Sequence, residues 1–410
     1  MEEKSILFKI WKFPKLSETF IVNQVITAIN LGFNVKILVE DFDDSAQIYY
    51  KEIFERYQLR GKIIHENYRI PENRVLRYCK ALILLIVNIK YLIKLRAFIK
   101  EYARFELRQI FMFNFFKSLH SFNVVHIQYG TNAKPLDILK KIKFFPPKII
   151  VSFHGHDLYF PINGRIPNNG YYNRLFEKAD KLIVNTPFLK RKLLELNAPN
   201  KKIEIIPVPV NTEFFKPHPT KNQSGVINLV TVGRLDELKG QVWGLKTIKE
   251  LVEKGYKVSY TIVGEGVKKR FLENEVKCMK IEKYVVFKGA LSQTKVLKIL
   301  QRSDIFLMTS ITSSNGMQES QGLVTAEAQA CGLPVVAFDS GGIKYTLKDG
   351  YSGFLCPEKD LDCFISKIEH LINNRELRNE MSADGIQFIY ERFSRHRIDG
   401  EWNKIYRNLC

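Results

Sequence analysis

The sequence has 410 residues, which is too long for one ordinary hydrophobic core, so its length predicts two domains. Its hydrophobic fraction of 45% is typical of a globular protein, whereas its net charge of +20 is unusual. Most of this charge lies in residues 1–210, which contain 34 Lys and Arg against 19 Asp and Glu. The asymmetry indicates an anionic partner for the first half, either nucleic acid or an acidic membrane face.

The cysteines and the N-terminal residues argue against several classes of protein. Six cysteines show neither a CxxC pair nor a regular spacing, which argues against a zinc site and a disulfide framework. The start, MEEKSILFKI, lacks a basic region followed by a long apolar core, and no run reaches the roughly 20 apolar residues of a membrane span. We therefore expect a reduced, cytosolic protein that is neither exported nor transmembrane.

Short β-branched runs alternate with longer helical patterns from one end of the chain to the other. In the first half the runs are SILFKI (5–10), VKILVE (35–40), VVHIQY (124–129), KIIVSF (148–153) and KLIVNT (181–186). In the second half they are INLVTV (227–232), VSYTIV (258–263), YVVFKG (284–289), DIFLMT (304–309) and PVVAF (334–338). This alternation predicts parallel sheets covered by helices on both faces.

A proline-rich polar break at residues 205–225 indicates a linker between two doubly wound α/β domains. We predict a Rossmann-like first domain at 1–210 and a Rossmann-like second domain at 211–386. A C-terminal helix at 387–410 is expected to pack back on the first domain.

The segment 74–117 carries ten Lys and Arg against Glu101 and Glu106. Arg96, Lys100, Arg104 and Arg108 recur every four residues among many aromatic side chains, which predicts one basic stripe along a helix. Such a helix suits the surface of an anionic membrane. The alternative is a solvated stripe over an ordinary core.

The motif DFDD at residues 41–44 resembles a metal-binding DxD sequence, but it is far in sequence from the other candidate motifs. We interpret it as a solvated loop and expect no metal site.

Three motifs of the second domain follow predicted strands, at the edge where open parallel sheets bind ligands. VGRLDELKG (232–240) follows the first strand, GEG (264–266) follows the second, and Glu319 follows DIFLMT. Arg234 and Lys239 could clamp a diphosphate, the first as a bidentate fork and the second as a point charge. The alternative is two solvated cations in a turn.

The stretch MQESQGLVTAEAQACGLPVVA (317–337) contains two glutamates among small and apolar residues. A helix beginning near Gly322 would be apolar on nearly every face and therefore buried. A carboxylate there is costly unless it is hydrogen-bonded, so we expect Glu327 to bind the vicinal hydroxyls of a ribose and Glu319 those of a second sugar. The predicted ligand is a nucleoside diphosphate sugar. The alternative, a capping or salt-bridged glutamate, is more reasonable for Glu319 than for Glu327.

The pair Glu319 and Glu327, followed by AQACGLPVVAFDSGG and preceded by GRL…KG, resembles the retaining glycosyltransferases of family 4. FPKLSETFIVNQVITAINLG (13–32), VVHIQYG (124–130) and FHGHDL (153–158) resemble the subgroup that builds bacterial exopolysaccharides such as colanic acid. The resemblance implies the GT-B fold, in which two Rossmann-like domains face each other across a cleft, the first binding the acceptor and the second the nucleotide sugar.

The resemblance also implies roles for individual residues. The catalytic candidates are His154, near the reacting carbon, and Glu319, on the transferred sugar. The donor site comprises Arg234 and Lys239 on the pyrophosphate, Glu327 on the ribose, and the backbone around Gly233, Gly264, Gly322, Leu323 and Val324. His154 would otherwise be a structural histidine at the end of a strand.

Three positions depart from the family pattern. Glu319 is followed by Ser320 where glycine is usual, and Lys344 and Tyr345 replace a common Pro-Glu pair. Pro14-Lys15-Leu16-Ser17 stands where many members have paired glycines.

We therefore expect a retaining, metal-independent hexosyltransferase without a cofactor. It would move a sugar onto a lipid-linked glycan of an exopolysaccharide, capsule or O-antigen, on the inner face of the cell membrane and without nucleic acid. The alternatives are a GT-B sugar nucleotide epimerase, a basic nucleic-acid-binding protein and an inactive binding module.

Overall fold

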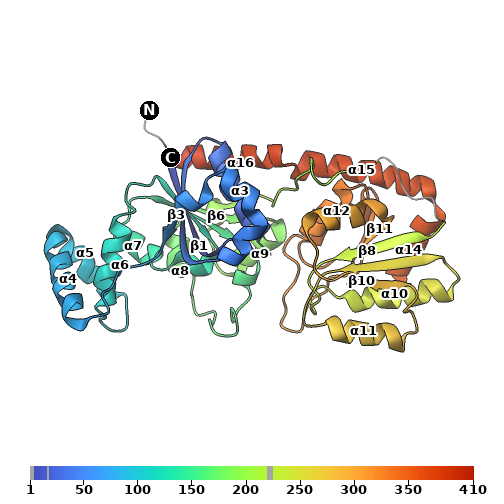
Figure 1. Ribbon diagram of the computed structural model, residues 1–410, viewed down its shortest axis with the longest axis horizontal. Coiled ribbons are helices and arrows are strands. Elements are labelled where there is room, and N and C mark those ends of the chain that lie inside the picture. The colour runs from blue at the N-terminus through green and yellow to red at the C-terminus, as the bar shows by residue number, and fades with distance from the viewer. Residues whose placement is uncertain (1–3, 16–17, 219–224) are drawn as a thin grey trace. The chain divides into compact units, whose positions relative to one another are not determined.

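The computed structural model describes residues 4–15, 18–218 and 225–410 (Figure 1). The chain divides into two compact units, each built around one sheet. Unit 1 comprises Met1–Val184, Lys190–Ile206 and Asp399–Cys410, and unit 2 comprises Asn185–Leu189 and Pro207–Ile398. The division therefore falls inside two helices, α9 (Pro187–Glu195) and α16 (Arg395–Leu409).

Unit 1 contains a parallel seven-stranded sheet with the order β3-β2-β1-β4-β5-β6-β7. Its strands are β1 (Ser5–Phe13), β2 (Asn34–Phe42), β3 (Ile63–His65), β4 (Val124–Gln128), β5 (Lys148–Phe153), β6 (Lys181–Val184) and β7 (Ile203–Ile205). Successive strands run outward from β1 to β3, and the chain then returns to the other side of β1 with β4. The topological switch point, where such sheets bind ligands, therefore lies between β1 and β4.

The helices of unit 1 are α1 (Thr19–Asn30), α2 (Asp44–Gln47), α3 (Lys51–Arg56), α4 (Arg74–Val87), α5 (Leu92–Lys100), α6 (Arg108–Lys117), α7 (Leu136–Lys141) and α8 (Asn173–Lys178). Helix α1 buries Ile21, Val22, Val25 and Ile26, the spacing of one helical face. The part of α16 in unit 1 is anchored by a 2.8 Å hydrogen bond between the Tyr406 hydroxyl and Nδ1 of the buried His126.

Unit 2 contains a parallel six-stranded sheet with the order β10-β9-β8-β11-β12-β13. Its strands are β8 (Ile227–Val232), β9 (Val258–Val263), β10 (Val285–Phe287), β11 (Ile305–Met308), β12 (Val335–Phe338) and β13 (Gly353–Cys356). The switch point here lies between β8 and β11. Its helices are α10 (Gln241–Glu253), α11 (Lys269–Cys278), α12 (Gln293–Arg302), α13 (Leu323–Ala330), α14 (Leu361–Asn373) and α15 (Arg375–Phe393).

Both faces of the unit 2 sheet are covered. Consecutive strand residues such as Leu229 and Val230 belong to separate apolar clusters, because side chains alternate across a strand. One cluster includes Leu245 and Ile248 of α10, and the other includes Ala326 of α13. The prediction of parallel sheets, with two doubly wound domains, is therefore confirmed.

Every strand predicted from the sequence is present, whereas the three-residue strands β3 and β7 and the four-residue strand β13 were not predicted. One boundary between the units, after Ile206, falls inside the predicted linker at 205–225. Residues 207–218 belong to unit 2, since Val210 and Phe215 are buried in its core. Residues 219–224 of that stretch, and Leu16 and Ser17 of the Pro14–Ser17 motif, lie outside the described residues.

The predicted basic stripe does not lie along one helix. Arg96 and Lys100 belong to α5, which ends at Lys100, while Arg104 lies in an irregular connection and Arg108 begins α6. Because the four residues do not share one helix, their regular spacing in the sequence does not place them on one helical face. Arg104 instead pairs with Glu106 at 3.3 Å, and the Arg108 guanidinium lies 5.1 Å from the centre of the Tyr68 ring.

The DFDD motif was interpreted as a loop, but it ends β2 and begins α2. Asp43 caps α2, accepting hydrogen bonds from the Ala46 N–H at 2.9 Å and the Ser45 hydroxyl at 2.6 Å. Those bonds, with an ion pair to Lys12, lower the pKa of Asp43 to about 2. These contacts give Asp43 a structural role.

Candidate functional site

Arg234, Lys239 and Glu319 of the predicted donor site lie in loops at the switch point of unit 2. Val232 ends β8 and is followed directly by Gly233 and Arg234, while Glu319 lies in the loop between β11 and α13. Loops at the carboxyl ends of these adjacent strands form one edge of the sheet, the position where parallel sheets bind ligands.

Glycine allows the loops after β8 and β9 to pack main chain against main chain. Gly264 has φ +145°, and a Cβ there would clash with the carbonyl oxygen of Gly233. Its own N–H donates to the Gly289 carbonyl at 2.9 Å. Any other residue at position 264 would push the β8 loop away, so this glycine fixes the backbone that carries Arg234.

Lys239 and Glu319 form the central ion pair of the site. The Lys239 Nζ donates to Glu319 Oε2, and only 16% and 14% of the two side chains are exposed. Burial acts to raise the pKa of Glu319 and is the largest single influence, but Lys239 and the backbone N–H of Gly322 outweigh it and lower the pKa overall. Glu319 is therefore ionised, and in this site Lys239 is its counter-ion.

Arg234 is held differently. Its side chain is 69% exposed and lies 3.3 Å from Asp236 Oδ2, whereas its carbonyl accepts a 2.8 Å hydrogen bond from the buried amide of Gln241. The backbone is thus anchored while the guanidinium stays in solvent, free to reorient toward an anion.

Glu327 lies in the predicted buried helix, α13, which begins directly after Gly322 (φ +74°). The side chain is half-buried, no donor contacts it within the described part of the chain, and burial raises its pKa to about 8. Leu323 and Val324 form the first turn of α13, where backbone N–H groups have no intrahelical acceptor. The sequence placed Glu327 in this helix correctly.

The segment 340–342 supports Glu319 through the backbone. The Gly342 N–H donates to the Glu319 carbonyl at 2.7 Å, and a Cβ at Gly342 would clash with the carbonyl oxygen of Ser320. Lys344, one of the unusual residues after these glycines, forms an exposed 3.0 Å ion pair with Asp339.

His154 follows β5 in unit 1. Its Nε2 donates to Gln128 Oε1 at 2.9 Å, because the Gln128 amide nitrogen itself donates to Gln24. Burial, with the nearby His156, lowers the pKa of His154 to about 3, so the imidazole is neutral at physiological pH. Its ring packs 4.7 Å from those of Phe20 and Tyr129, measured between ring centres.

Two family models together match most of the chain. The model described as Glycosyltransferase Family 4 matches residues 17–214, and the model described as Glycosyl transferases group 1 matches residues 212–388. The chain therefore combines a family 4 glycosyltransferase domain with a group 1 glycosyltransferase domain.

Curated relatives resemble this glycosyltransferase over its whole length. The amylovoran biosynthesis glycosyltransferase AmsK of Erwinia amylovora is 26% identical over 99% of this chain and 98% of its own. The putative colanic acid biosynthesis glycosyltransferase WcaL of Escherichia coli is 25% identical over 98% of both chains.

Solved structures establish the fold of the glycosyltransferase as GT-B. The Anabaena protein HepE, crystallised with UDP, superposes with a TM-score of 0.73 at 14% identity, covering 99% of this chain and 100% of its own. A glycosyltransferase from Rickettsia africae superposes with a TM-score of 0.72 at 18% identity, covering 100% and 99% of the two chains.

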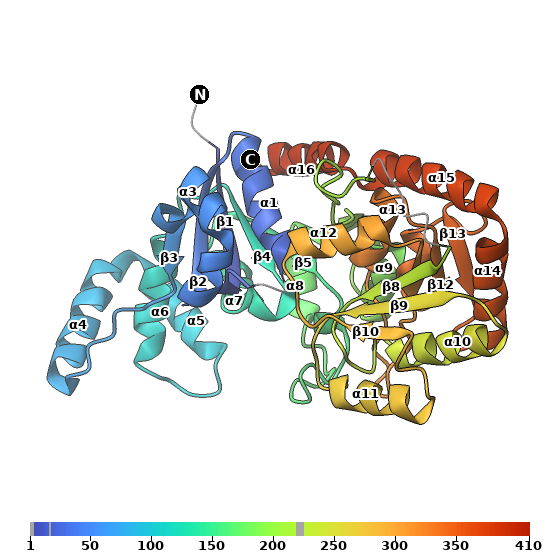
Figure 2. The same cartoon turned by 45° about the vertical axis from the view of Figure 1, so that its right-hand side comes forward.

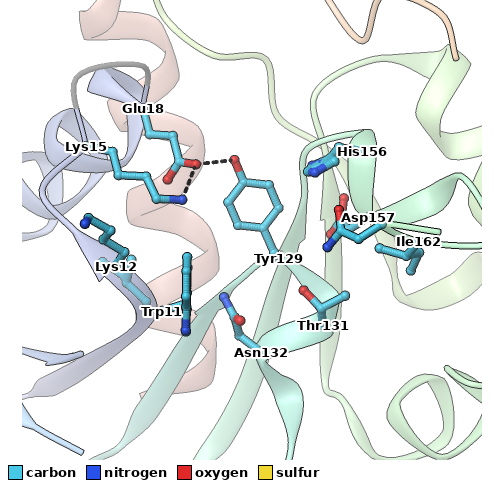
Figure 3. A pocket seen from close by; sticks show the side chains of 12 residues that line it. Trp11, Lys12, Lys15, Glu18, Tyr129, Thr131, Asn132, His156, Asp157 and Ile162 are labelled. Carbon is cyan, nitrogen blue, oxygen red and sulfur yellow. Dashed lines mark hydrogen bonds and ion pairs between the residues drawn. The ribbon is translucent and has the colours of Figure 1, made fainter. Parts of the chain in front are cut away.

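Unit 1 of the glycosyltransferase has a pocket of about 330 Å³ at its own switch point (Figure 3). It is lined by residues of three connections: Ile10, Trp11, Lys12, Lys15 and Glu18 between the end of β1 and the start of α1, Tyr129, Thr131 and Asn132 after β4, and His156, Asp157, Ile162 and Asn163 after β5. Asp157 holds the loops together, accepting from the N–H groups of Gly130, His154 and Gly155 at 2.8 to 3.1 Å.

The sequence indicated none of these pocket residues as functional. Trp11 offered one signal, since it is a large aromatic residue directly after the predicted strand SILFKI (5–10). Asp157 lies in the motif FHGHDL (153–158), which carries the family resemblance but gave this residue no role. Asn132 offered no signal, because its position depends on how the loop after β4 folds.

Within residues 4–15, 18–218 and 225–410, His, Cys, Asp and Glu form no group of three or more that could hold a metal ion. All six cysteines are free thiols.

Proposed function

We propose that this glycosyltransferase transfers a sugar from a nucleoside diphosphate sugar to a lipid-linked glycan, with retention at the anomeric carbon. The observation that carries the proposal is the Lys239–Glu319 ion pair at the unit 2 switch point, beside an anchored arginine. The names of AmsK and WcaL support a role in the biosynthesis of a bacterial exopolysaccharide, with a capsule or O-antigen as related products.

The donor would bind by exchanging protein contacts for ligand contacts. Arg234 and Lys239 bind the diphosphate, together with the first-turn N–H groups of α13. When Lys239 turns to a phosphate oxygen, Glu319 accepts hydrogen bonds from the transferred sugar instead. Glu327 accepts hydrogen bonds from the ribose hydroxyls, which satisfies a half-buried carboxylate that has no donor among the described residues.

The proposed chemistry is a same-face displacement. The bond from the anomeric carbon to the phosphate oxygen breaks, the acceptor oxygen bonds to the same face, and the acceptor proton passes to the departing phosphate. Arg234 and Lys239 stabilise the charge that develops on the diphosphate. His154, as a neutral imidazole, acts in this step through a hydrogen bond rather than as a cation.

We propose that this reaction needs neither a metal nor a cofactor. Two cations and a helix N-terminus supply the positive charge that the leaving diphosphate requires. Activity should persist in EDTA, and a requirement for added magnesium or manganese would contradict this part of the proposal.

A lipid-linked acceptor requires the enzyme to reach a membrane surface, and we propose that α4 makes this contact. None of the helices in the described part of the chain has the length and apolar character of a bilayer span. Helix α4 nevertheless exposes 57 to 70% of seven large apolar side chains: Val75, Leu76, Tyr78, Leu82, Ile83, Ile86 and Val87. Most recur at intervals of three or four residues, which places them along one side of the helix.

The opposite side of α4 is packed within unit 1. Ala81 and Asn88 are buried, and the Asn88 amide donates to Asn114 of α6 at 3.1 Å. In Figures 1 and 2, α6 lies between α4 and the strands of unit 1, so α4 is outermost in this unit. Among the described residues of unit 1, no element covers the apolar side, and patches of this kind mark interaction sites.

Charge favours an anionic bilayer as the surface that covers α4. Residues 73–100 contain seven Lys and Arg and no Asp or Glu. A second copy of the chain would bring the same positive charge to the contact, whereas anionic lipid headgroups neutralise it. Apolar side chains flanked by cations are the arrangement of helices that lie in a membrane interface.

The function is tested first by donor binding. A thermal-shift panel of nucleoside diphosphates and their sugars should show stabilisation by one base, since a ligand at 100 times its Kd adds about 2.7 kcal/mol. Incubation of the selected donor with membranes that contain lipid-linked glycan should then release the nucleoside diphosphate and label the lipid. Conversion of the donor to an epimer, with no transfer, would instead support the epimerase.

A further inference from the structure

The unit 1 pocket combines the half-exposed Trp11 ring with amide and hydroxyl groups, and the Lys15 ammonium lies 5.3 Å from the centre of that ring. Trp11 is 50% exposed, although the five residues before it in β1 are buried. Thr131 and Asn132 lie in the loop after β4, and the Asn132 amide donates to the Gln128 carbonyl at 2.6 Å, which orients its oxygen. An apolar ring face beside fixed polar groups suits a pyranose, which presents C–H bonds on one face and hydroxyls at its rim.

The backbone beside the pocket is strained at Tyr129. This residue has φ 67° and ψ 128°, an unfavourable conformation for a side chain with a Cβ. Its N–H still donates to the Ser152 carbonyl at 2.9 Å, and its hydroxyl donates to Glu18 at 3.1 Å. The strain places the Tyr129 ring between the pocket and His154, 4.7 Å from the histidine ring centre.

Both lysines of the pocket already have carboxylate partners. Lys15 lies 3.0 Å from Glu18, as the dashed lines in Figure 3 show, and Lys12 lies 3.0 Å from Asp41 and 3.2 Å from Asp43. A ligand carboxylate or phosphate would therefore have to displace one of these partners. It would also meet Glu18, which remains negatively charged beside the pocket.

From these observations we propose that the unit 1 pocket binds the terminal residue of the acceptor as an uncharged pyranose, stacked on Trp11, and discriminates against acidic sugars. That the bound sugar is the acceptor rests on the proposed transfer reaction. The binding of a neutral pyranose and the exclusion of acidic sugars do not depend on that reaction. The volume of about 330 Å³ lies at the small end of ligand pockets, which suits one or two sugar rings.

Tryptophan fluorescence can test the proposal on the full chain. Trp11 is the exposed tryptophan, since Trp402 is buried and Trp243 is half-buried. Methyl glycosides of glucose, galactose and mannose are titrated against the parent and against Trp11→Phe, whose signal is subtracted. At least one should protect Trp11 from acrylamide quenching in a saturable way, and the matching uronic acid methyl glycoside should bind at least tenfold more weakly.

Two variants separate the outcomes. Calorimetry, which does not depend on the Trp11 signal, compares the variants. Trp11→Ala should lose the neutral glycoside, whereas Glu18→Gln, which leaves Lys15 without its carboxylate, should improve the uronide at least threefold and change the neutral glycoside less. Equal or tighter binding of uronides by the parent would overturn the proposal, as would failure of every neutral glycoside to protect Trp11. Nucleoside diphosphate binding, measured in parallel, reports on the proposed transfer reaction alone, so the two can fail separately.

Discussion

The two switch points of this molecule have the same strand topology, but different kinds of side chain lie at them. In unit 2 the loops after β8 and β11 bring a lysine and a glutamate into a mostly buried ion pair, on a backbone held by glycines. In unit 1 the loops after β1 and β4 surround a pocket with an exposed indole, amides and already paired lysines. A parallel sheet thus fixes where a ligand binds, while the loop residues decide which ligand it is.

The two units also differ in how they present charge. Two cations, Arg234 and Lys239, lie at the unit 2 site, whereas residues 73–100 of unit 1 carry seven Lys and Arg and no Asp or Glu. This difference suggests that unit 2 binds the donor, whereas unit 1 contacts the membrane and binds the acceptor. The following predictions test that division, beginning with the largest expected effect.

Glu319→Ala should lower kcat by roughly a hundredfold or more without weakening nucleoside diphosphate binding. The variant removes hydrogen bonds of a charged group to the sugar, each contributing about 1.5–3 kcal/mol, but not the contacts to the diphosphate. Steady-state kinetics and calorimetry with the bare nucleotide measure the two effects. An unchanged kcat would move the sugar site away from this ion pair.

Ile83→Glu combined with Ile86→Glu should weaken binding to vesicles containing phosphatidylglycerol by at least thirtyfold. Each substitution removes an apolar side chain that would be buried in the bilayer and adds a negative charge that anionic lipid repels. Vesicle flotation measures binding, and Val267→Glu, at an apolar position of unit 2 that is 89% exposed, is the matched control.

Charge reversal at Arg96 and Lys100 should have a smaller effect that disappears at high salt, because screening removes only the electrostatic part. Nucleotide affinity should stay constant in all these variants. A gel-shift assay run alongside would expose nucleic-acid binding, and indifference of the parent protein to anionic vesicles at low salt would refute the α4 proposal.

His154→Ala should lower kcat about tenfold with little change in nucleotide affinity, the loss expected for one hydrogen bond made in the transition state. Because its pKa lies near 3, His154 stays neutral from pH 5 to 9 and should contribute no limb to the pH profile of kcat in that range. The neutral ring donates its one N–H to Gln128, so Nδ1 acts as an acceptor, and His154→Gln, whose side chain can also accept a hydrogen bond, should recover part of the rate. Full activity of the alanine variant would make the residue structural.

Nucleoside diphosphate affinity should rise severalfold between pH 6.5 and 8 and then level off. The pKa of Glu327 is about 8 in the free protein, and hydrogen bonds from ribose hydroxyls to the ionised carboxylate lower it in the complex. Binding below pH 8 therefore releases one proton. The affinity for nucleoside diphosphate can then rise by at most tenfold for each pH unit. Calorimetry should show this slope for the parent, and Glu327→Gln should bind more weakly without it.

The sequence predicted unit 2 more completely than unit 1 for a physical reason. Arg234, Lys239 and Glu319 all follow strands that are visible as β-branched runs, so their common edge follows from topology alone. In unit 1 the four-residue spacing of Arg96 to Arg108 suggested a helix, but no local signal showed that α5 ends at Lys100. The exposure of α4 could not be predicted from the sequence either, because an exposed apolar helix has the same composition as a buried one.

The Lys239–Glu319 ion pair has a consequence for the order of events after transfer. On the proposed assignments, a complete donor compensates both partners, since its diphosphate meets Lys239 and its sugar hydroxyls meet Glu319. The nucleoside diphosphate that remains after transfer still holds Lys239 but leaves a largely buried carboxylate without its counter-ion. When Lys239 pairs with Glu319 again, the nucleoside diphosphate loses its contact to Lys239 and dissociates more readily. The same ion pair that forms in the free enzyme therefore also promotes product release.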